Sequence, residues 1–174
     1  MLFRSQPFCQ MADGTLLSEG LGMLLLKRLA DAERDGDRIY AVVKGVGTSS
    51  DGKALGLLAP RPEGEILALQ RAYEKSGIAP ESIGLIEAHG TGIPLGDRTE
   101  IHSLTQVFGS RQHLPHCALG SVKSMIGHCL PAAGAASLIK TVLALYHKVL
   151  PPTLCEQVNS DLEIEQTPFY LNTE

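Results

Sequence analysis

Short runs of apolar residues recur along the chain, each bounded by charged or turn-forming residues. They lie at residues 23–26, 40–46, 83–88, 117–120 and 169–171. Runs of this length are typical of strands buried within a sheet. The first two are separated by a charged segment that contains Asp35-Gly36-Asp37. Since this is turn chemistry, we predict two strands joined by a loop.

Three other segments are typical of helices. The first begins near Pro62 and ends before Gly77, the second stops at Gly109, and the third is the Ala-rich stretch 131–148. The apolar faces consist of Ile66, Leu69 and Tyr73 in the first helix and of Ile101, Leu104 and Phe108 in the second. Strands that alternate with helices predict an α/β fold with a mainly parallel sheet.

Composition narrows the class of protein without naming a function. The 174 residues are 44% hydrophobic and 20% charged, which suits one ordinary globular domain. A net charge of −4 offers no basic surface for nucleic acid or an anionic membrane. The longest apolar stretch, 131–150, contains Lys140, His147 and Lys148, so we interpret it as a buried helix. Residues 1–10 lack the apolar core of a signal peptide, and we expect a cytoplasmic protein.

The cysteines and clustered histidines give no metal signature. Cys9, Cys117, Cys129 and Cys155 form no CxxC pair and no zinc spacing, so we predict four reduced thiols. Two histidines flank Leu114-Pro115, but two ligands in a Pro-containing loop rarely make a metal site. We therefore expect no bound metal.

Two Gly-rich loops are the best candidates for a functional site. One covers residues 87–97 and the other residues 120–128, and each follows a predicted strand. Sites in parallel sheets form in the loops that leave the carboxyl ends of strands. The loops carry His89 and His128. A histidine in such a loop is often structural, so both interpretations stay open on spacing alone.

Both loops resemble motifs of the β-ketoacyl synthases. The first reads His89-Gly90-Thr91-Gly92 and then Pro94-Leu95-Gly96-Asp97, similar to the family's HGTGT-PxGD motif. The second reads Val122-Lys123-Ser124-Met125-Ile126-Gly127-His128, similar to K-S-x-x-G-H. Further similar segments are Pro7-Phe8, residues 12–14, 18–22, 132–134 and 149–153. Several motifs in the right order identify the chain as similar to the ketosynthase domains of modular polyketide and polyunsaturated fatty acid synthases.

The resemblance implies a thiolase-like fold of two similar α/β halves. Residues 1–40 would end the first half, and residues 41–174 would form most of the second half, truncated before its last strands. The family's nucleophilic cysteine motif would lie before Met1, and its Gly-Phe-Gly-Gly segment after Glu174. On this interpretation the chain is one piece of a larger domain.

The activity that the resemblance implies is that of a 3-oxoacyl-[acyl-carrier-protein] synthase in fatty acid or polyketide biosynthesis. Such enzymes condense a malonyl thioester with an acyl thioester and release CO₂. The resemblance implies no tightly bound cofactor, because the substrates are attached as thioesters to the phosphopantetheine of an acyl carrier protein. The implied partners are this carrier protein and a second copy in a homodimer, without nucleic acid or membrane. A non-catalytic remnant, or an assembly half that contributes only dimer contacts, is the alternative; a thiolase-type acyl-CoA enzyme is disfavoured by the lysine motif.

The resemblance also assigns roles to single residues. His89 and His128 match the family's two catalytic histidines, whose neutral N–H groups would stabilise an enolate oxygen. Lys123 matches the family lysine, a cation that would favour neutral imidazoles. Glu100 matches the acidic residue that pairs with this lysine, and Thr91 stands where the family contacts the phosphopantetheine arm.

Several positions have simpler interpretations or depart from the family. Asp97, with Glu100 three residues later, resembles a capping box, so we predict that Asp97 caps a helix. Cys129 adjoins His128, but adjacent side chains rarely face each other, and we predict a packed thiol. Ile93 replaces the second family threonine, which removes one hydroxyl contact to the pantetheine arm.

Overall fold

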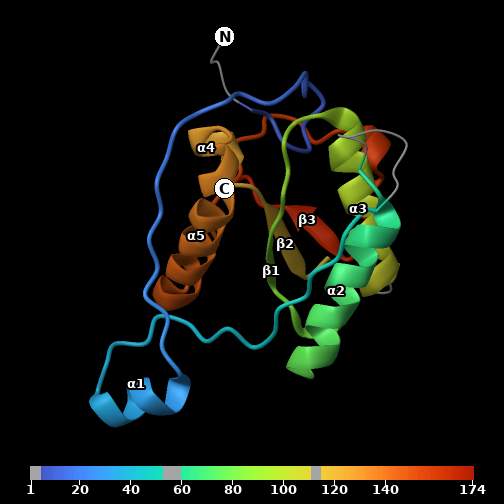
Figure 1. Ribbon diagram of the computed structural model, residues 1–174. Helices are drawn as coiled ribbons and strands as arrows, with labels where there is room; N and C mark the ends of the chain where they lie inside the picture. Colours follow the sequence, from blue (N-terminus) through green and yellow to red (C-terminus); the bar gives the residue numbers. More distant parts are fainter. Residues whose placement is uncertain (1–4, 53–59, 111–114) are drawn as a thin grey trace.

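A three-stranded parallel sheet forms the centre of the structure (Figure 1). The computed structural model describes residues 5–52, 60–110 and 115–174. Strand β1 (Leu85–Glu87) pairs with β2 (Cys117–Gly120), which pairs with β3 (Phe169–Leu171). The central strand β2 is buried along its whole length. The predicted parallel sheet is therefore confirmed. Strand β1 takes up the middle of the apolar run 83–88, and the flanking Gly84 carbonyl and Ala88 N–H also bond to β2, at 2.9 and 2.8 Å.

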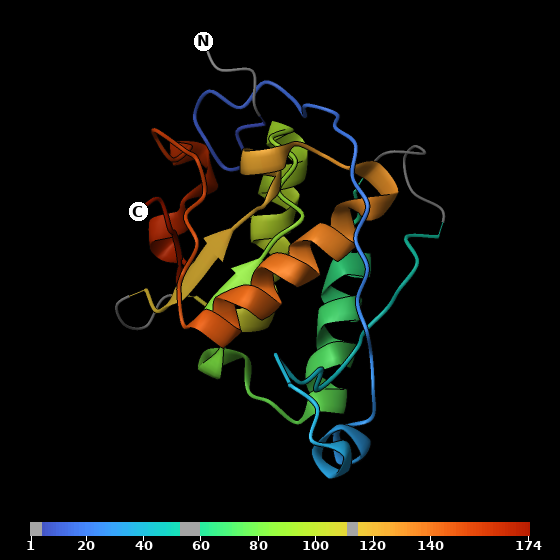
Figure 2. The ribbon, with the colours of Figure 1, turned by 90° about the vertical axis from the view of Figure 1, so that its left-hand side faces the viewer.

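Helices cover both faces of the sheet. Helices α2 (Pro62–Ser76) and α3 (Pro94–Phe108) lie on one side, and α5 (Ala133–His147) lies on the other (Figures 1 and 2). Gly77 ends α2 in the left-handed region with φ 65°, and Gly109 follows α3, as predicted. In the described parts of the chain, no helix is long and apolar enough to cross a membrane.

Shorter helical turns connect these elements. They are α4 (Lys123–Ile126) and the 3-10 turns η1 (Pro80–Ser82), η2 (Leu130–Ala132), η3 (Ser160–Leu162) and η4 (Ile164–Gln166). The turn η2 takes up the start of the predicted Ala-rich helix, so that α5 proper begins at Ala133.

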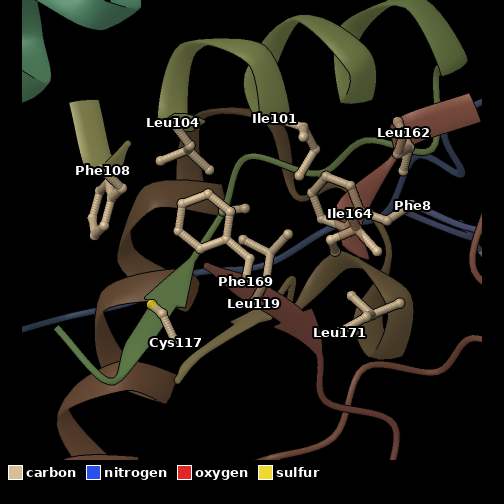
Figure 3. Close-up of a cluster of buried hydrophobic side chains, with 11 residues drawn as sticks. Phe8, Ile101, Leu104, Phe108, Cys117, Leu119, Leu162, Ile164, Phe169 and Leu171 are labelled. Atoms are coloured by element: carbon tan, nitrogen blue, oxygen red, sulfur yellow. The ribbon is translucent and has the colours of Figure 1, made fainter. Parts of the chain in front are cut away.

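The hydrophobic core lies between the sheet and α3 (Figure 3). The predicted apolar face of α3 points into it, and Phe108 stacks edge-on against Phe169 of β3 with ring centroids 5.2 Å apart. Tyr73 of α2 meets Phe108 in the same geometry at 5.6 Å. Phe8 reaches this core from the N-terminal part of the chain. Aromatic pairs of this kind stabilise a core beyond their buried area.

The first two predicted strands are absent from the sheet. Residues 23–26 and 40–46 are extended, but they belong to no strand, and helix α1 (Leu29–Asp35) lies between them. The helix ends at Gly36 with φ 69°, and an ion pair at 2.6 Å joins its last residue, Asp35, to Lys27 just before its start. An apolar run forms a strand only beside a partner, and none of the described residues supplies one here. The prediction of two strands is wrong for this reason.

One face of the extended segment is bare. Residues Leu21, Met23 and Leu25 alternate along it and are 82%, 84% and 97% exposed. The segment runs beside α5 (Figure 1), and on its opposite side a Cβ on Gly22 would come within 2.7 Å of the Ala135 Cβ. Between the segment and α5 there is a mainly apolar pocket of about 420 Å³. Exposed leucine and methionine side chains that alternate along an extended segment form a surface that favours association.

We predict that the isolated chain self-associates through this bare face. Replacing Leu21, Met23 and Leu25 together by threonine keeps the β-propensity and removes apolar area, so the average mass in sedimentation velocity should fall. Replacing the exposed Leu67 of α2 by threonine is the control and should leave the mass distribution unchanged. A monodisperse monomer formed by the parent chain would contradict this prediction.

Candidate functional site

The two sequence-predicted histidines meet at the carboxyl end of the sheet. His89 follows β1, and His128 follows α4, which itself follows β2. Because β1 and β2 are parallel neighbours, their loops leave the same edge. The imidazole centroids are 5.6 Å apart, and the ring planes are inclined by 83°. The fold thus brings together two residues that are far apart in sequence.

Hydrogen bonding fixes the proton position of His128. Its Nδ1 accepts a hydrogen bond from the Leu130 backbone N–H at 3.0 Å. A nitrogen that accepts carries no proton, so the neutral ring is protonated at Nε2. The His128 backbone is held in turn by Leu16 and Ser18, through N–H···O bonds of 2.8 and 3.1 Å. The ring therefore presents an N–H donor from an anchored loop.

Lys123 lies under the histidines rather than in solvent. It is only 2% exposed, and its Nζ donates to the His89 carbonyl oxygen at 2.6 Å. Burial lowers the pKa of both His89 and His128, and the Lys123 ammonium lowers it further. Burial also lowers the pKa of Lys123, while the carboxylates of Glu100 and Glu87 oppose that lowering. The arrangement favours neutral imidazoles.

Glu100 holds the same loop from the other side. From α3, its carboxylate accepts the backbone N–H of His89 at 2.6 Å and that of Gly90 at 2.8 Å. Among the described residues Glu100 forms no direct ion pair with Lys123, but its carboxylate opposes the lowering of the lysine pKa, so the two charges interact at a distance. The two charged groups instead bind the carbonyl and amide sides of the His89 peptide units. A direct pair would leave those backbone groups without these partners.

Asp97 organises the loop and does not cap a helix. Because Pro94 starts α3, Asp97 lies inside the first turn, with its side chain directed back toward the loop. One carboxylate oxygen accepts from the N–H groups of Thr91 and Gly92 at 3.1 and 3.2 Å, and the other accepts from the Phe8 N–H at 2.7 Å. Burial raises the pKa of the Asp97 carboxyl, although the three N–H donors oppose this shift. The predicted N-cap role is wrong, since proline takes the first helical position.

Close packing restricts the centre of the loop. Gly90 has φ 42°, and a Cβ there would come within 2.7 Å of the Ser121 Cβ and 2.9 Å of the Phe8 ring. The Ser121 hydroxyl donates to the Gly90 carbonyl at 3.0 Å. Glycine is therefore required both for its backbone conformation and for space. Thr91 is buried beside it, and its hydroxyl accepts from the Ile93 N–H at 3.4 Å.

A buried ion pair, which the sequence interpretation missed, joins the two loops to α5. Glu87 accepts from the Val122 N–H at 2.6 Å and from Lys140 Nζ at 2.8 Å. The Glu87 and Lys140 side chains are 6% and 11% exposed. The sequence did hold a signal for this pair: Glu87 lies in the apolar run 83–88 and Lys140 in the apolar stretch 131–150. Charges in buried segments need partners of opposite charge. Which charges pair depends on the fold.

The cysteines fall into two classes. Cys9 and Cys155 form a disulfide, so the prediction of four reduced thiols is wrong for this pair. Cys117 and Cys129 are free and buried. The Cys129 Sγ lies 3.2 Å from the Ser18 hydroxyl, which confirms the predicted packed thiol.

No metal centre is seen in the described parts of the chain. There, no group of three or more histidine, cysteine, aspartate or glutamate side chains is arranged to hold an ion. His116 is exposed, and His113, its companion in the weak metal motif, lies outside the described residues.

We predict that the buried pair contributes more to stability than a surface pair. Replacing Lys140 by methionine leaves the Glu87 carboxylate buried without its cation and should lower the free energy of unfolding by about 3 kcal/mol. Adding Glu87→Gln to this variant should recover part of the loss. The control is Arg98→Met, which breaks an exposed ion pair with Asp161 and should cost at most about 1 kcal/mol. Equal losses for both single variants in urea unfolding would refute the assignment.

We predict a pH-dependent contribution from Glu100. Burial raises its pKa to about 7, and Glu65 and Asp97 add to this, although the two amide donors oppose it. Between about pH 5 and pH 7 the folded chain keeps a proton that the unfolded chain has lost, so ionisation destabilises the fold as pH rises. Relative to Glu100→Gln, the parent should lose about 2 kcal/mol of unfolding free energy over this range. His89 and His128 titrate in both proteins, so a difference that does not change with pH would disprove the raised pKa.

Comparison with known proteins agrees with this geometry. Residues 40–156, more than half of the chain, match the family described as "Beta-ketoacyl synthase, C-terminal domain". The chain is 46% identical over 164 residues to polyketide synthase PksM of Bacillus subtilis, with 93% of this chain and 4% of PksM aligned. It is 44% identical over 168 residues to a polyunsaturated fatty acid synthase polypeptide of Thraustochytrium sp., with 92% of this chain and 6% of that protein aligned.

Solved structures give the same result. The ketosynthase from module 6 of the bacillaene synthase of Bacillus subtilis superposes with a TM-score of 0.94 at 43% identity, covering 98% of this chain. The ketosynthase from module 1 of the bacillaene synthase of Bacillus amyloliquefaciens gives 0.93 at 38% identity. The chain spans only 31% and 33% of these two ketosynthase chains. With its sequence and its fold both matching, the chain belongs to the β-ketoacyl synthase family, as a C-terminal domain of the kind found in polyketide and polyunsaturated fatty acid synthases.

Proposed function

We propose that this chain supplies the decarboxylation half of a 3-oxoacyl-[acyl-carrier-protein] synthase. The observation that carries the proposal is the pair of adjacent imidazoles, His89 and His128, in edge-to-face contact beside the buried Lys123. Residues 1–40 would complete the first half of a thiolase-like fold, and residues 41–174 would form most of the second. The nucleophilic cysteine would belong to a segment outside the chain.

The condensation begins with the loss of CO₂ from a malonyl thioester. The electrons of the breaking C–C bond move onto the thioester, and negative charge develops on its oxygen. Neutral N–H donors directed at this oxygen stabilise the enolate, and His128 has its Nε2 proton available for that purpose. The enolate carbon then attacks the acyl-cysteine thioester, forms the new C–C bond and releases the cysteine thiolate.

The charged residues act on the histidines and not on the substrate. Lys123 would keep both imidazoles neutral and hold the His89 carbonyl, and Glu100 would position the His89 and Gly90 amides. Thr91 would face the phosphopantetheine arm once a substrate enters. Glu100 is thus a positioning residue, whereas His89 and His128 are the proposed catalytic pair.

The proposed partners follow from the substrate. An acyl carrier protein would deliver both thioesters on its phosphopantetheine, and a second copy would complete a homodimer. The alternative is a non-catalytic remnant or an assembly half, for which the bare apolar face of residues 21–25 is the relevant observation. An upstream in-frame cysteine motif in the gene would favour the enzyme, and a stop codon would favour the remnant.

The test uses a complete ketosynthase that contains this chain. His89→Ala and His128→Ala should each slow release of labelled CO₂ from malonyl-carrier protein by about 10²–10³, the usual cost of losing one oxyanion donor. Acyl transfer from a labelled thioester should change less, because it depends on the cysteine and its own donors. Lys123→Ala should impair both steps.

The matched control is His102→Ala, which removes an exposed histidine of α3. It should alter neither CO₂ release nor acyl transfer. If both catalytic-histidine variants released CO₂ at the parent rate, the proposed role of the pair would be wrong.

A further inference from the structure

Two cysteines from opposite ends of the chain meet beneath the histidine loop. Cys9 and Cys155 are separated by 146 residues, and their Cα atoms lie 5.7 Å apart. This separation lies in the ordinary range for a disulfide. Cys9 is 1% exposed, whereas Cys155 is partly exposed. Only Cys155 can therefore meet a reagent from solvent.

Backbone hydrogen bonds, independent of the sulfurs, bring the two cysteines together. The Gln10 N–H donates to the Gln157 carbonyl, and the Asn159 N–H donates to the Phe8 carbonyl, both at 2.9 Å. Cys9 and Val158 form an antiparallel bridge between these bonds. We call this contact between residues 5–10 and 153–160 the terminal seam. The seam holds the thiols in register whether or not they are joined.

The terminal seam contacts the histidine loop through a single residue, Phe8. Phe8, next to Cys9, donates its N–H to Asp97, which also holds Thr91 and Gly92. Its ring lies against Gly90. Phe8 has φ 64°, a conformation that a non-glycine residue keeps only when its surroundings hold it. A covalent tie at Cys9 restrains the residue on which this part of the loop rests.

We propose that Cys9 and Cys155 form a reversible thiol–disulfide site, oxidised by low-molecular-weight disulfides, that fastens the terminal seam under the histidine loop. This site is additional to the proposed condensation chemistry and does not depend on it. From the sequence we expect a reducing compartment, where protein disulfides are mostly transient and redox-sensing.

Exposure dictates the order of the exchange. The Cys155 thiolate attacks a small disulfide, forms a mixed disulfide and releases one small thiolate, which takes up a proton. Cys9, held alongside by the seam, then loses its proton and attacks the Cys155 sulfur. This step forms the intramolecular bond and releases the second small thiol. Two protein thiols are oxidised, and one small disulfide is reduced to two thiols.

The two remaining cysteines provide internal controls. Cys117 is fully buried in β2, and burial raises its pKa to about 12, so its thiol stays protonated. Cys129 is buried against Ser18. A thiol that is both protonated and inaccessible exchanges slowly. The fold therefore selects the pair 9–155 from the possible pairings.

The test treats the full 174-residue chain with glutathione disulfide and maps its peptides by mass spectrometry. The expected product is a single cross-link between Cys9 and Cys155, which excess dithiothreitol reverses. Cys9→Ser should stop at a mixed disulfide on Cys155, and Cys155→Ser should leave Cys9 unmodified. Cys129→Ser is the matched control and should cross-link as the parent does. The same treatment in guanidinium chloride should scramble the pairings, since unfolding removes the seam.

Hydrogen exchange tests whether the bond fastens the seam. Oxidation should slow exchange of the Gln10 and Asn159 amides by about tenfold, because their bonds cross the seam. The amides of Thr91 and Gly92 should slow in the same sense, and Cys155→Ser should show no response to oxidant. The proposal is overturned if the folded parent forms no 9–155 cross-link, if its cysteines pair indiscriminately, or if the cross-link leaves the Gln10 and Asn159 exchange rates unchanged.

Discussion

The peptide units around His89 are held by groups of opposite charge, and the geometry of the site depends on this arrangement. The Lys123 ammonium binds the carbonyl of His89, while the Glu100 carboxylate binds its amide and the next one. The two ions come from α4 and α3, which leave different strands. Buried backbone groups need partners, and charged partners form the stronger hydrogen bonds. One lysine and one glutamate thus set the position of the loop and the electrostatic environment of both imidazoles.

The same arrangement explains why Lys123 and Glu100 do not form a direct ion pair. Each directs its hydrogen bonds to the peptide units that lie between them, so the two side chains are linked through the backbone of the His89 loop. The ion pair between Glu87 and Lys140 adds a second set of charged contacts. It ties the end of β1 and the start of α4 to α5. Moving either loop would break bonds to buried charges, which is far more costly than breaking exposed ones. The site is rigid for reasons that lie in its polar interior.

Much of this could be predicted from local sequence. The helices ending at Gly77 and Gly109 and the buried strand 117–120 follow from periodicity and glycine chemistry, and the two histidine loops follow from their place after strands. Prediction failed where an answer depended on residues distant in sequence. Residues 23–26 have the composition of a strand but no partner among the described residues. Asp97 is a residue type that often caps helices, but Pro94 starts this helix and the Asp97 carboxylate binds amides outside it. The pairing of Cys9 with Cys155 leaves no signature in spacing, because the seam that aligns them exists only in the folded chain.

The supports of the histidine loop are widely scattered along the chain, and this has a consequence for the order of folding. Phe8 precedes the loop by about eighty residues, Ser121 and Lys123 follow it by about thirty, and the Thr153 hydroxyl that holds the Ser121 amide comes later still. Contacts of such long range form after local helices, because closing a long loop costs entropy before any contact compensates for it. During synthesis, the segment that bears His89 therefore leaves the ribosome before Ser121, Lys123 and Thr153, which support it from later in the chain. We therefore expect this loop to stay open to proteases until these later residues have folded against it.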